Sequence, residues 1–204
     1  MDRDEFLIAL KAAGDEGRLE DACRRHLLHG TPFVFAGREN DFFDFRRRIA
    51  DRLSVGFHEV FVVGSAKLGF SLFKEKSFDL DSDIDVVIVS DKLFDKFMEQ
   101  IRYYQSALRR SRRAVSTREQ DMYHQFLEYV ALGWIRPDKL PLSFALSDLK
   151  EDWFSFFRSI SNGKSEVGNY KVAGGVFRTY QHLEAYHLEG LREMYESLCV
   201  KEQA

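Results

Sequence analysis

The stretch VFVVGSAKLGFSLFKEKSFDLDSDIDVVIVS, Val60 to Ser90, decides the fold that we expect for this chain. It contains two short apolar runs rich in valine, a pattern typical of buried β-strands. The turn Gly64-Ser65 follows the first run, and the second run begins with Asp83-Ile84-Asp85. Two carboxylates one residue apart at the start of a buried strand need a chemical reason.

We expect the two aspartates to bind a metal ion. Residues i and i+2 of a strand point to the same side, so the carboxylates of Asp83 and Asp85 would stand next to each other. Like charges that close together are unfavourable, and a divalent cation removes the conflict. Mg²⁺ prefers oxygen ligands and commonly takes one or two carboxylates together with the phosphates of a substrate. The alternative is that the pair only caps a strand end at the surface.

The turn before the aspartates has the features of a phosphate-binding site. Gly64 allows close approach of a ligand to the backbone, and Ser65 offers a hydroxyl and an amide. A helix that began here would direct its first amides at a phosphate, and Lys67 would add a positive charge. A phosphate cradle beside a metal pair predicts a nucleoside triphosphate site, although a plain turn and a surface lysine are the simpler alternatives.

With its Gly64-Ser65 turn and its SDIDVVIVS run, the chain resembles the nucleotidyltransferase fold, the DNA polymerase β-like superfamily. The resemblance implies that Gly64 and Ser65 contact the triphosphate and that Asp83 and Asp85 bind Mg²⁺ or Mn²⁺. It implies transfer of a nucleotidyl group from an NTP to an acceptor hydroxyl on a protein, an RNA end, a small molecule or a second nucleotide. The small size of the chain favours a toxin–antitoxin or phage-defence transferase, with a protein partner as a further expectation.

Two departures from the family pattern qualify this resemblance. Seventeen residues separate Ser65 from Asp83, more than the family usually has, and the extra residues suggest a loop over the site. The family also supplies a third carboxylate from a later strand, but the strand expected here, YKVAGGVFR, contains no acid. Glu166 lies just before this strand, and Asp148, Asp121 and Glu128 are more distant candidates for this acid. The missing acid supports a second hypothesis, a catalytically degenerate module that binds a nucleotide or regulates a partner.

The composition limits the remaining possibilities. The 204 residues carry a net charge of −3, so any attraction to phosphates must come from a local patch. Nineteen phenylalanines indicate an aromatic core. Two isolated cysteines fit a reducing compartment, no apolar run is long enough to span a membrane, and the acidic start is unlike a signal peptide. We therefore expect a cytoplasmic protein without a membrane segment.

The rest of the chain predicts an α/β (α+β) fold, with a small mixed sheet of the nucleotidyltransferase type surrounded by helices. We expect one domain over residues 1–204, with an N-terminal helical extension to about residue 55 and C-terminal helices. Helices are predicted at 3–12, 18–28, 39–53, 91–110 and 117–133, and over the C-terminal segment from Tyr180. Residues 33–35 are expected to be extended, and YKVAGGVFR is expected to be a third strand. Ser90 is the predicted N-cap of the helix at 91–110.

Three other groups of residues have structural interpretations that outweigh functional ones. A run of arginines could cap a helix end or form a nucleic-acid patch; it comprises Arg109, Arg110, Arg112, Arg113 and Arg118. His182 and His187 are five residues apart, whereas two histidines that bind zinc from one helix are four apart. The segment DWFSFFRSI is interpreted as core and not as a platform for stacking bases.

Overall fold

The computed structural model of the chain describes residues 1–110, 116–140 and 147–202. Arg112 and Arg113 of the arginine run lie outside these residues. The first residues of the helix that begins at Ser147 are described in backbone only, and Asp148 is among them.

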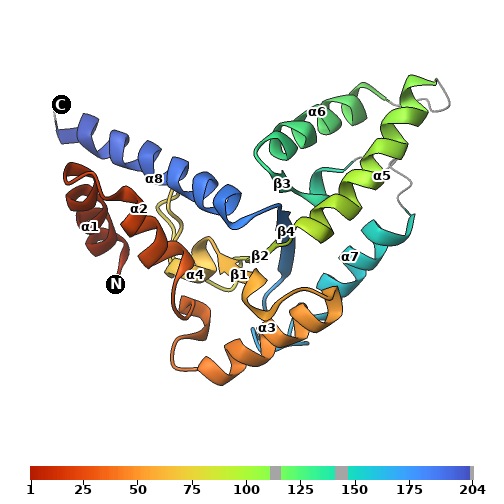
Figure 1. Cartoon of the computed structure of the whole chain (residues 1–204). Helices are drawn as coiled ribbons and strands as arrows, with labels where there is room; N and C mark the ends of the chain where they lie inside the picture. The colour runs from red at the N-terminus through yellow and green to blue at the C-terminus, as the bar shows by residue number, and fades with distance from the viewer. Residues whose placement is uncertain (111–115, 141–146, 203–204) are drawn as a thin grey trace.

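Four strands form one mixed sheet in the middle of the chain (Figure 1). In sequence order they are β1 (Val60–Val63), β2 (Ile84–Val89), β3 (Trp134–Ile135) and β4 (Val172–Phe177). The strand order is β1-β2-β4-β3, with β2 parallel to β4 and both outer pairs antiparallel. The mixed α/β architecture expected from the sequence is therefore confirmed, whereas β3 was not predicted.

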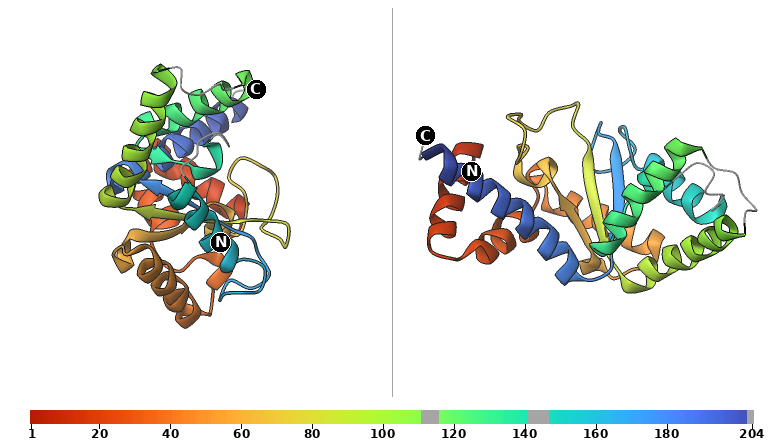
Figure 2. Two further views of the ribbon diagram at one scale, coloured as in Figure 1. Left: turned by 90° about the vertical axis from the view of Figure 1, so that its right-hand side faces the viewer. Right: turned by 90° about the horizontal axis from the view of Figure 1, so that it is seen from above.

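Helices flank this sheet on both faces (Figure 2). The α-helices are α1 (Arg3–Asp15), α2 (Leu19–Ala22), α3 (Glu39–Leu53), α4 (Ser65–Leu68), α5 (Asp91–Arg109), α6 (Thr117–Ala131), α7 (Ser147–Ser159) and α8 (Tyr180–Glu202). Shorter helical turns are η1 (Cys23–Leu28), η2 (Phe33–Phe35), η3 (Phe57–Glu59) and η4 (Pro137–Lys139). The predicted N-cap of α5 is confirmed, since the Ser90 hydroxyl accepts a hydrogen bond from the Leu93 N–H at 3.4 Å.

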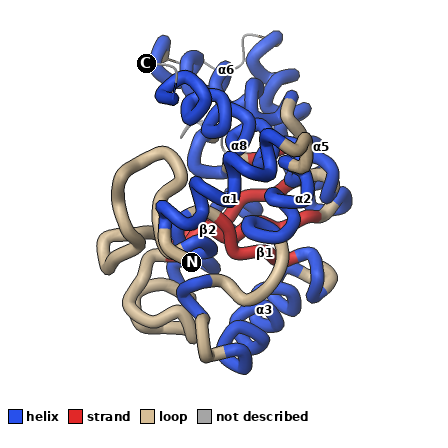
Figure 3. Tube along the Cα trace, turned by 90° about the vertical axis from the view of Figure 1, so that its left-hand side faces the viewer, coloured by secondary structure: helices blue, strands red, loops and turns tan. Residues whose placement is uncertain are grey.

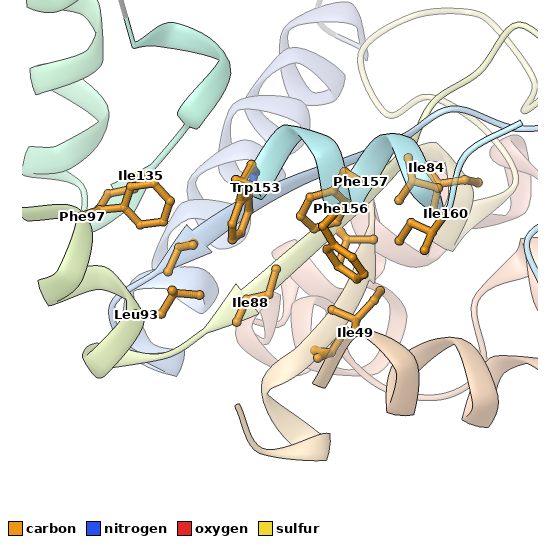
Figure 4. Close-up of a cluster of buried hydrophobic side chains, with 14 of the residues drawn as sticks. Ile49, Ile84, Ile88, Leu93, Phe97, Ile135, Trp153, Phe156, Phe157 and Ile160 are labelled. Carbon is orange, nitrogen blue, oxygen red and sulfur yellow. The ribbon is translucent and has the colours of Figure 1, made fainter. Parts of the chain in front are cut away.

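The two faces of the sheet have different partners because side chains alternate along each strand. Ile84, Val86 and Ile88 of β2 point into the larger core, which α3, α5 and α7 cover. Figure 4 shows Trp153, Phe156 and Phe157 of α7 lying over this face. Val87 points to the other face, where it packs with Phe177 and with Leu183 of α8. Asp85 has the same parity as Val87, so the alternation places it on the α8 face.

The N-terminal helices pack against α8 and not against the large core. Phe6 and Leu10 of α1 and Cys23 and Leu27 of η1 form a separate buried cluster, which Leu191 of α8 completes. Figure 3 shows α1 and α2 beside α8. This apolar cluster packs the N-terminal helices against the C-terminal helix.

Two sequence-based expectations need correction in this region. Phe33–Phe35 forms a 3₁₀ turn after Pro32 and is not extended. The helix expected after the Gly-Ser turn is a single turn, Ser65–Leu68, because Gly69 adopts φ 89° and ends it.

Among the described residues, no helix is both long and apolar enough to cross a lipid bilayer.

Candidate functional site

Asp83 and Asp85 lie where three strands meet. Asp85 pairs with Val63, the last residue of β1, and with Ala173 of β4. The residue between the two aspartates, Ile84, donates its N–H to the Lys171 carbonyl at 2.8 Å and buries its side chain in the opposite core. Asp85 therefore lies next to the Gly64-Ser65 turn, and Asp83, which immediately precedes β2, is close enough to raise the pKa of Asp85.

Gly64 lies beside the Asp85 carboxylate. Its φ of 66° is a conformation that side chains rarely adopt. A β-carbon built on Gly64 would lie 3.1 Å from Asp85 Oδ2, tighter than nine in ten such contacts. The backbone conformation therefore favours glycine here, and any side chain at this position would also press on the Asp85 carboxylate.

Electrostatic strain is concentrated on Asp85. Its side chain reaches solvent, but protein atoms surround it closely, and this desolvation raises the pKa of its carboxyl group above the usual value. The negative charge of Asp83 raises this pKa further, while Arg136 and Lys171 act in the opposite direction. A carboxylate that is destabilised by a neighbouring carboxylate is a suitable ligand for a divalent cation.

Lys171 lies beside the pair and was not singled out from the sequence. Its ammonium group contacts Asp83 Oδ2 at 2.8 Å. It immediately precedes β4, two residues before Ala173, the residue that faces Asp85. The sequence analysis looked for an acid on this strand, and the structure instead shows a small side chain opposite Asp85 and a cation on Asp83.

A second group that the sequence analysis missed comes from β3 and η4. The guanidinium group of Arg136 lies 5.1 Å from the ring centre of Tyr129 and 5.2 Å from that of Trp134. It also holds Asp138 through two contacts, of 2.9 and 3.3 Å. Both charges are close enough to Asp85 to affect its pKa. A two-residue strand has too little pattern to be recognised in sequence, so nothing pointed to these residues.

Lys67 does not face the aspartates. Its side chain is buried and donates hydrogen bonds to the main-chain carbonyls of His29 and Gly30, the latter at 2.9 Å. Burial lowers the pKa of its ammonium group to about 8. Lys67 therefore ties α4 to the segment after η1, and its expected contact with a triphosphate stays a prediction.

The loop between Gly69 and Asp83 is anchored close to the site. Phe70 and Ser77 form an isolated antiparallel bridge within it. The ring of Phe78 packs on Tyr170 at 5.0 Å between centres, immediately before Lys171. Asp79 and Ser82 hydrogen-bond to each other at 2.9 Å, which closes the turn that leads into Asp83. The long insertion is thus folded onto the start of β4.

The acids named as third-carboxylate candidates are engaged elsewhere or lie on other elements. Glu166 pairs with Arg48 of α3 at 2.5 Å. Asp121 and Glu128 are exposed on α6, and the side chain of Asp148 is outside the description. Within the described ranges, no three His, Cys, Asp or Glu side chains come together in a group that could hold a metal ion.

The other groups weighed in the sequence have structural partners. His182 shares a hydrogen bond of 2.7 Å with the Thr179 hydroxyl at the start of α8, and Glu184 pairs with Arg24 of η1 at 2.5 Å. His187 is partly exposed, but its Nε2 is buried and has no hydrogen-bond partner in the described part of the chain. Trp153, Phe156 and Phe157 belong to the core, as predicted.

Comparisons with protein-family models, with curated proteins and with solved structures find no match for this chain.

Proposed function

We propose that this protein is a metal-dependent nucleotidyltransferase of the DNA polymerase β-like fold. The observation that supports this most is the position of Asp85 beside Gly64, with Asp83 close enough to raise the pKa of Asp85. The small mixed sheet, with β2 between β1 and β4, agrees with the resemblance.

Each residue at the site has a definite role in this reaction. Asp83 and Asp85 would hold Mg²⁺ or Mn²⁺, which when bound supplies charge neutralisation for the phosphates of an NTP. The main chain at Gly64 and the hydroxyl of Ser65 would orient the triphosphate. The oxygen of an acceptor hydroxyl then bonds to the α-phosphorus, the bond from that phosphorus to the bridging oxygen breaks, and pyrophosphate leaves with the electron pair. The hydroxyl proton is released to solvent.

The test measures pyrophosphate release and nucleotide binding with each of the four NTPs in Mg²⁺ or Mn²⁺. We expect release with at least one NTP and its loss in Asp83→Asn and Asp85→Asn. Asp81→Asn is the matched control, because Asp81 is an exposed acid two residues before Asp83. Equal activity of all four proteins, or binding of no NTP by the wild-type chain, would contradict the proposal.

The second candidate function is a nucleotide-binding or regulatory module without catalysis. Ala173 opposite Asp85 and Lys171 on Asp83 favour it, because the β4 strand contributes no carboxylate to the site. This candidate predicts that nucleotides raise the melting temperature of the wild-type chain but not of Asp85→Asn, with no pyrophosphate released from any NTP. Release of pyrophosphate would exclude it.

A further inference from the structure

The backbone of Lys171 is fixed beside the aspartates. The Lys171 carbonyl accepts a hydrogen bond from the N–H of Ile84, the residue between the two aspartates, at 2.8 Å. From there its ammonium group reaches Asp83 Oδ2 at 2.8 Å. Even if this ion pair opened, the lysine would stay within one side-chain length of the aspartate pair.

The ion pair itself is open to solvent. The side chains of Lys171 and Asp83 are 65% and 44% exposed, and exposed ion pairs of this kind contribute little to stability. A divalent cation can therefore take over Asp83, and the lysine would then be free to contact another anion nearby.

The β4 strand leaves room beside Asp85 and supplies no further carboxylate. Ala173 is the direct neighbour of Asp85 across the parallel pair, and its side chain points to the same face. A site that binds two divalent ions during phosphoryl transfer needs carboxylates enough to hold both. Asp83 and Asp85 are the two carboxylates that β2 provides here.

Formal charges indicate that Lys171 could replace a second divalent ion. A site of three carboxylates and two divalent ions has a net charge of plus one. A site of two carboxylates, one lysine and one divalent ion has the same net charge. Two divalent ions on Asp83, Asp85 and Lys171 would leave plus three. The Arg136–Asp138 pair is neutral as a unit and does not change this comparison.

We propose that this site binds one divalent cation and that Lys171 serves as its second positive charge, moving from Asp83 to a phosphate oxygen when a nucleotide enters. This inference rests on the proposed function and adds the metal count and a phosphate ligand. Lys171 competes with the metal for Asp83 in the free protein but contributes to binding of the triphosphate. Removal of its charge must then change the two affinities in opposite directions.

The experiment titrates the protein with Mn²⁺ alone and then with inorganic tripolyphosphate at saturating Mn²⁺. Electron paramagnetic resonance counts the bound metal, and calorimetry follows the tripolyphosphate. For Lys171→Met we expect Mn²⁺ to bind up to about tenfold more tightly and tripolyphosphate about tenfold more weakly than for the wild type. Lys164→Met is the matched control, an exposed lysine on the loop before β4, and should change neither affinity.

Metal stoichiometry gives an independent measurement. The wild-type chain should bind one Mn²⁺ with tripolyphosphate present, and Ala173→Asp, which places a carboxylate beside Asp85, should bind a second. Ala173→Asn has the same size without the charge and should still bind one.

The outcomes separate this inference from the proposed function. Two Mn²⁺ on the wild-type chain, or changes of the same sign in both affinities of Lys171→Met, would overturn the role of Lys171 even if Asp85→Asn loses all binding. Failure of the wild-type chain to bind either Mn²⁺ or tripolyphosphate would overturn both.

Discussion

At the scale of single residues, chemistry at the site conflicts with stability. Asp85 carries a charge that both its surroundings and Asp83 disfavour, and Gly64 holds a backbone conformation that few residues adopt. Such conflicts are typical of functional sites, where burial and neighbouring charges shift pKa values. The raised pKa of Asp85 can be tested without knowledge of the substrate.

Asp85→Asn should stabilise the metal-free protein at neutral pH. The pKa of Asp85 is raised on folding, so its ionisation costs stability as the pH rises from the usual aspartate range through the folded value. The gain should be absent at a pH low enough to protonate Asp85 in both states, and below about 1 kcal/mol at neutral pH because the side chain reaches solvent. Urea unfolding at several pH values measures it; destabilisation at neutral pH would contradict this account.

Lys67→Met tests which of two roles this lysine has. If it only ties α4 to the carbonyls of His29 and Gly30, its loss should lower the free energy of unfolding by about 1–3 kcal/mol. Nucleotide affinity should then stay unchanged. Lys74→Met, a change at an exposed lysine of the following loop, should alter neither quantity. Weaker nucleotide binding at unchanged stability would instead support the triphosphate contact predicted from the sequence.

At the scale of elements, α8 carries a histidine that is unsuited to acid. Burial lowers the pKa of His187 to about 4, and its Nε2 has no described hydrogen-bond partner. The unfolded chain therefore takes up this proton before the folded one does. The contribution of His187 to stability is complete above about pH 6.5 and is lost as the pH falls from there towards 4.

His187→Leu should remove part of this acid sensitivity. Between pH 7 and pH 4 we expect the wild type to lose about 1–3 kcal/mol more stability than the variant, measured by urea unfolding at each pH. His124→Leu, which replaces an exposed histidine on α6, should retain the wild-type dependence. A wild-type slope in His187→Leu would show that other groups cause the acid sensitivity.

At the scale of the whole molecule, the question is whether residues 1–204 unfold as one unit. The cluster that joins α1 and η1 to α8 is separate from the large core, yet α8 follows β4 directly and packs on the sheet through Leu183. Both tryptophans, Trp134 and Trp153, are remote in sequence from α1 and report on the sheet and its core. Their fluorescence can thus detect coupling between the two regions.

Phe6→Ala should destabilise the protein by about 3–5 kcal/mol, because Phe6 is only 1% exposed. If the chain is a single domain, tryptophan fluorescence and far-ultraviolet circular dichroism should both report this loss at one shared midpoint. Ile8→Ala on the same helix is the control, since Ile8 is 72% exposed. An unchanged tryptophan transition would indicate that the N-terminal helices unfold on their own.

Much of the fold could be read from particular sequence patterns. The β-strand at Val60–Val63, the strand after Asp83 and the strand in YKVAGGVFR are each continuous apolar runs, and α3 and α5 show clear helical spacing. Patterns of that length predict the structure correctly because local backbone geometry and burial favour the same element. β3, with two residues, and α4, with one turn, are too short to have a period, so tertiary contacts decide them.

The candidate site also has a part that the sequence predicts and a part that only the tertiary structure decides. Spacing alone puts Asp83 and Asp85 on one side of a strand, since alternation is a local property of extended backbone. The approach of Asp85 to Gly64, the ion pair of Lys171, the position of the Arg136–Asp138 pair and the inward turn of Lys67 all depend on which strands become neighbours. The sequence by itself determined the longer elements and the spacing of the two carboxylates. The tertiary structure decided which charges surround them, because strand order brings together residues as far apart in the chain as Asp83 and Lys171, and local pattern contains no information about such separations.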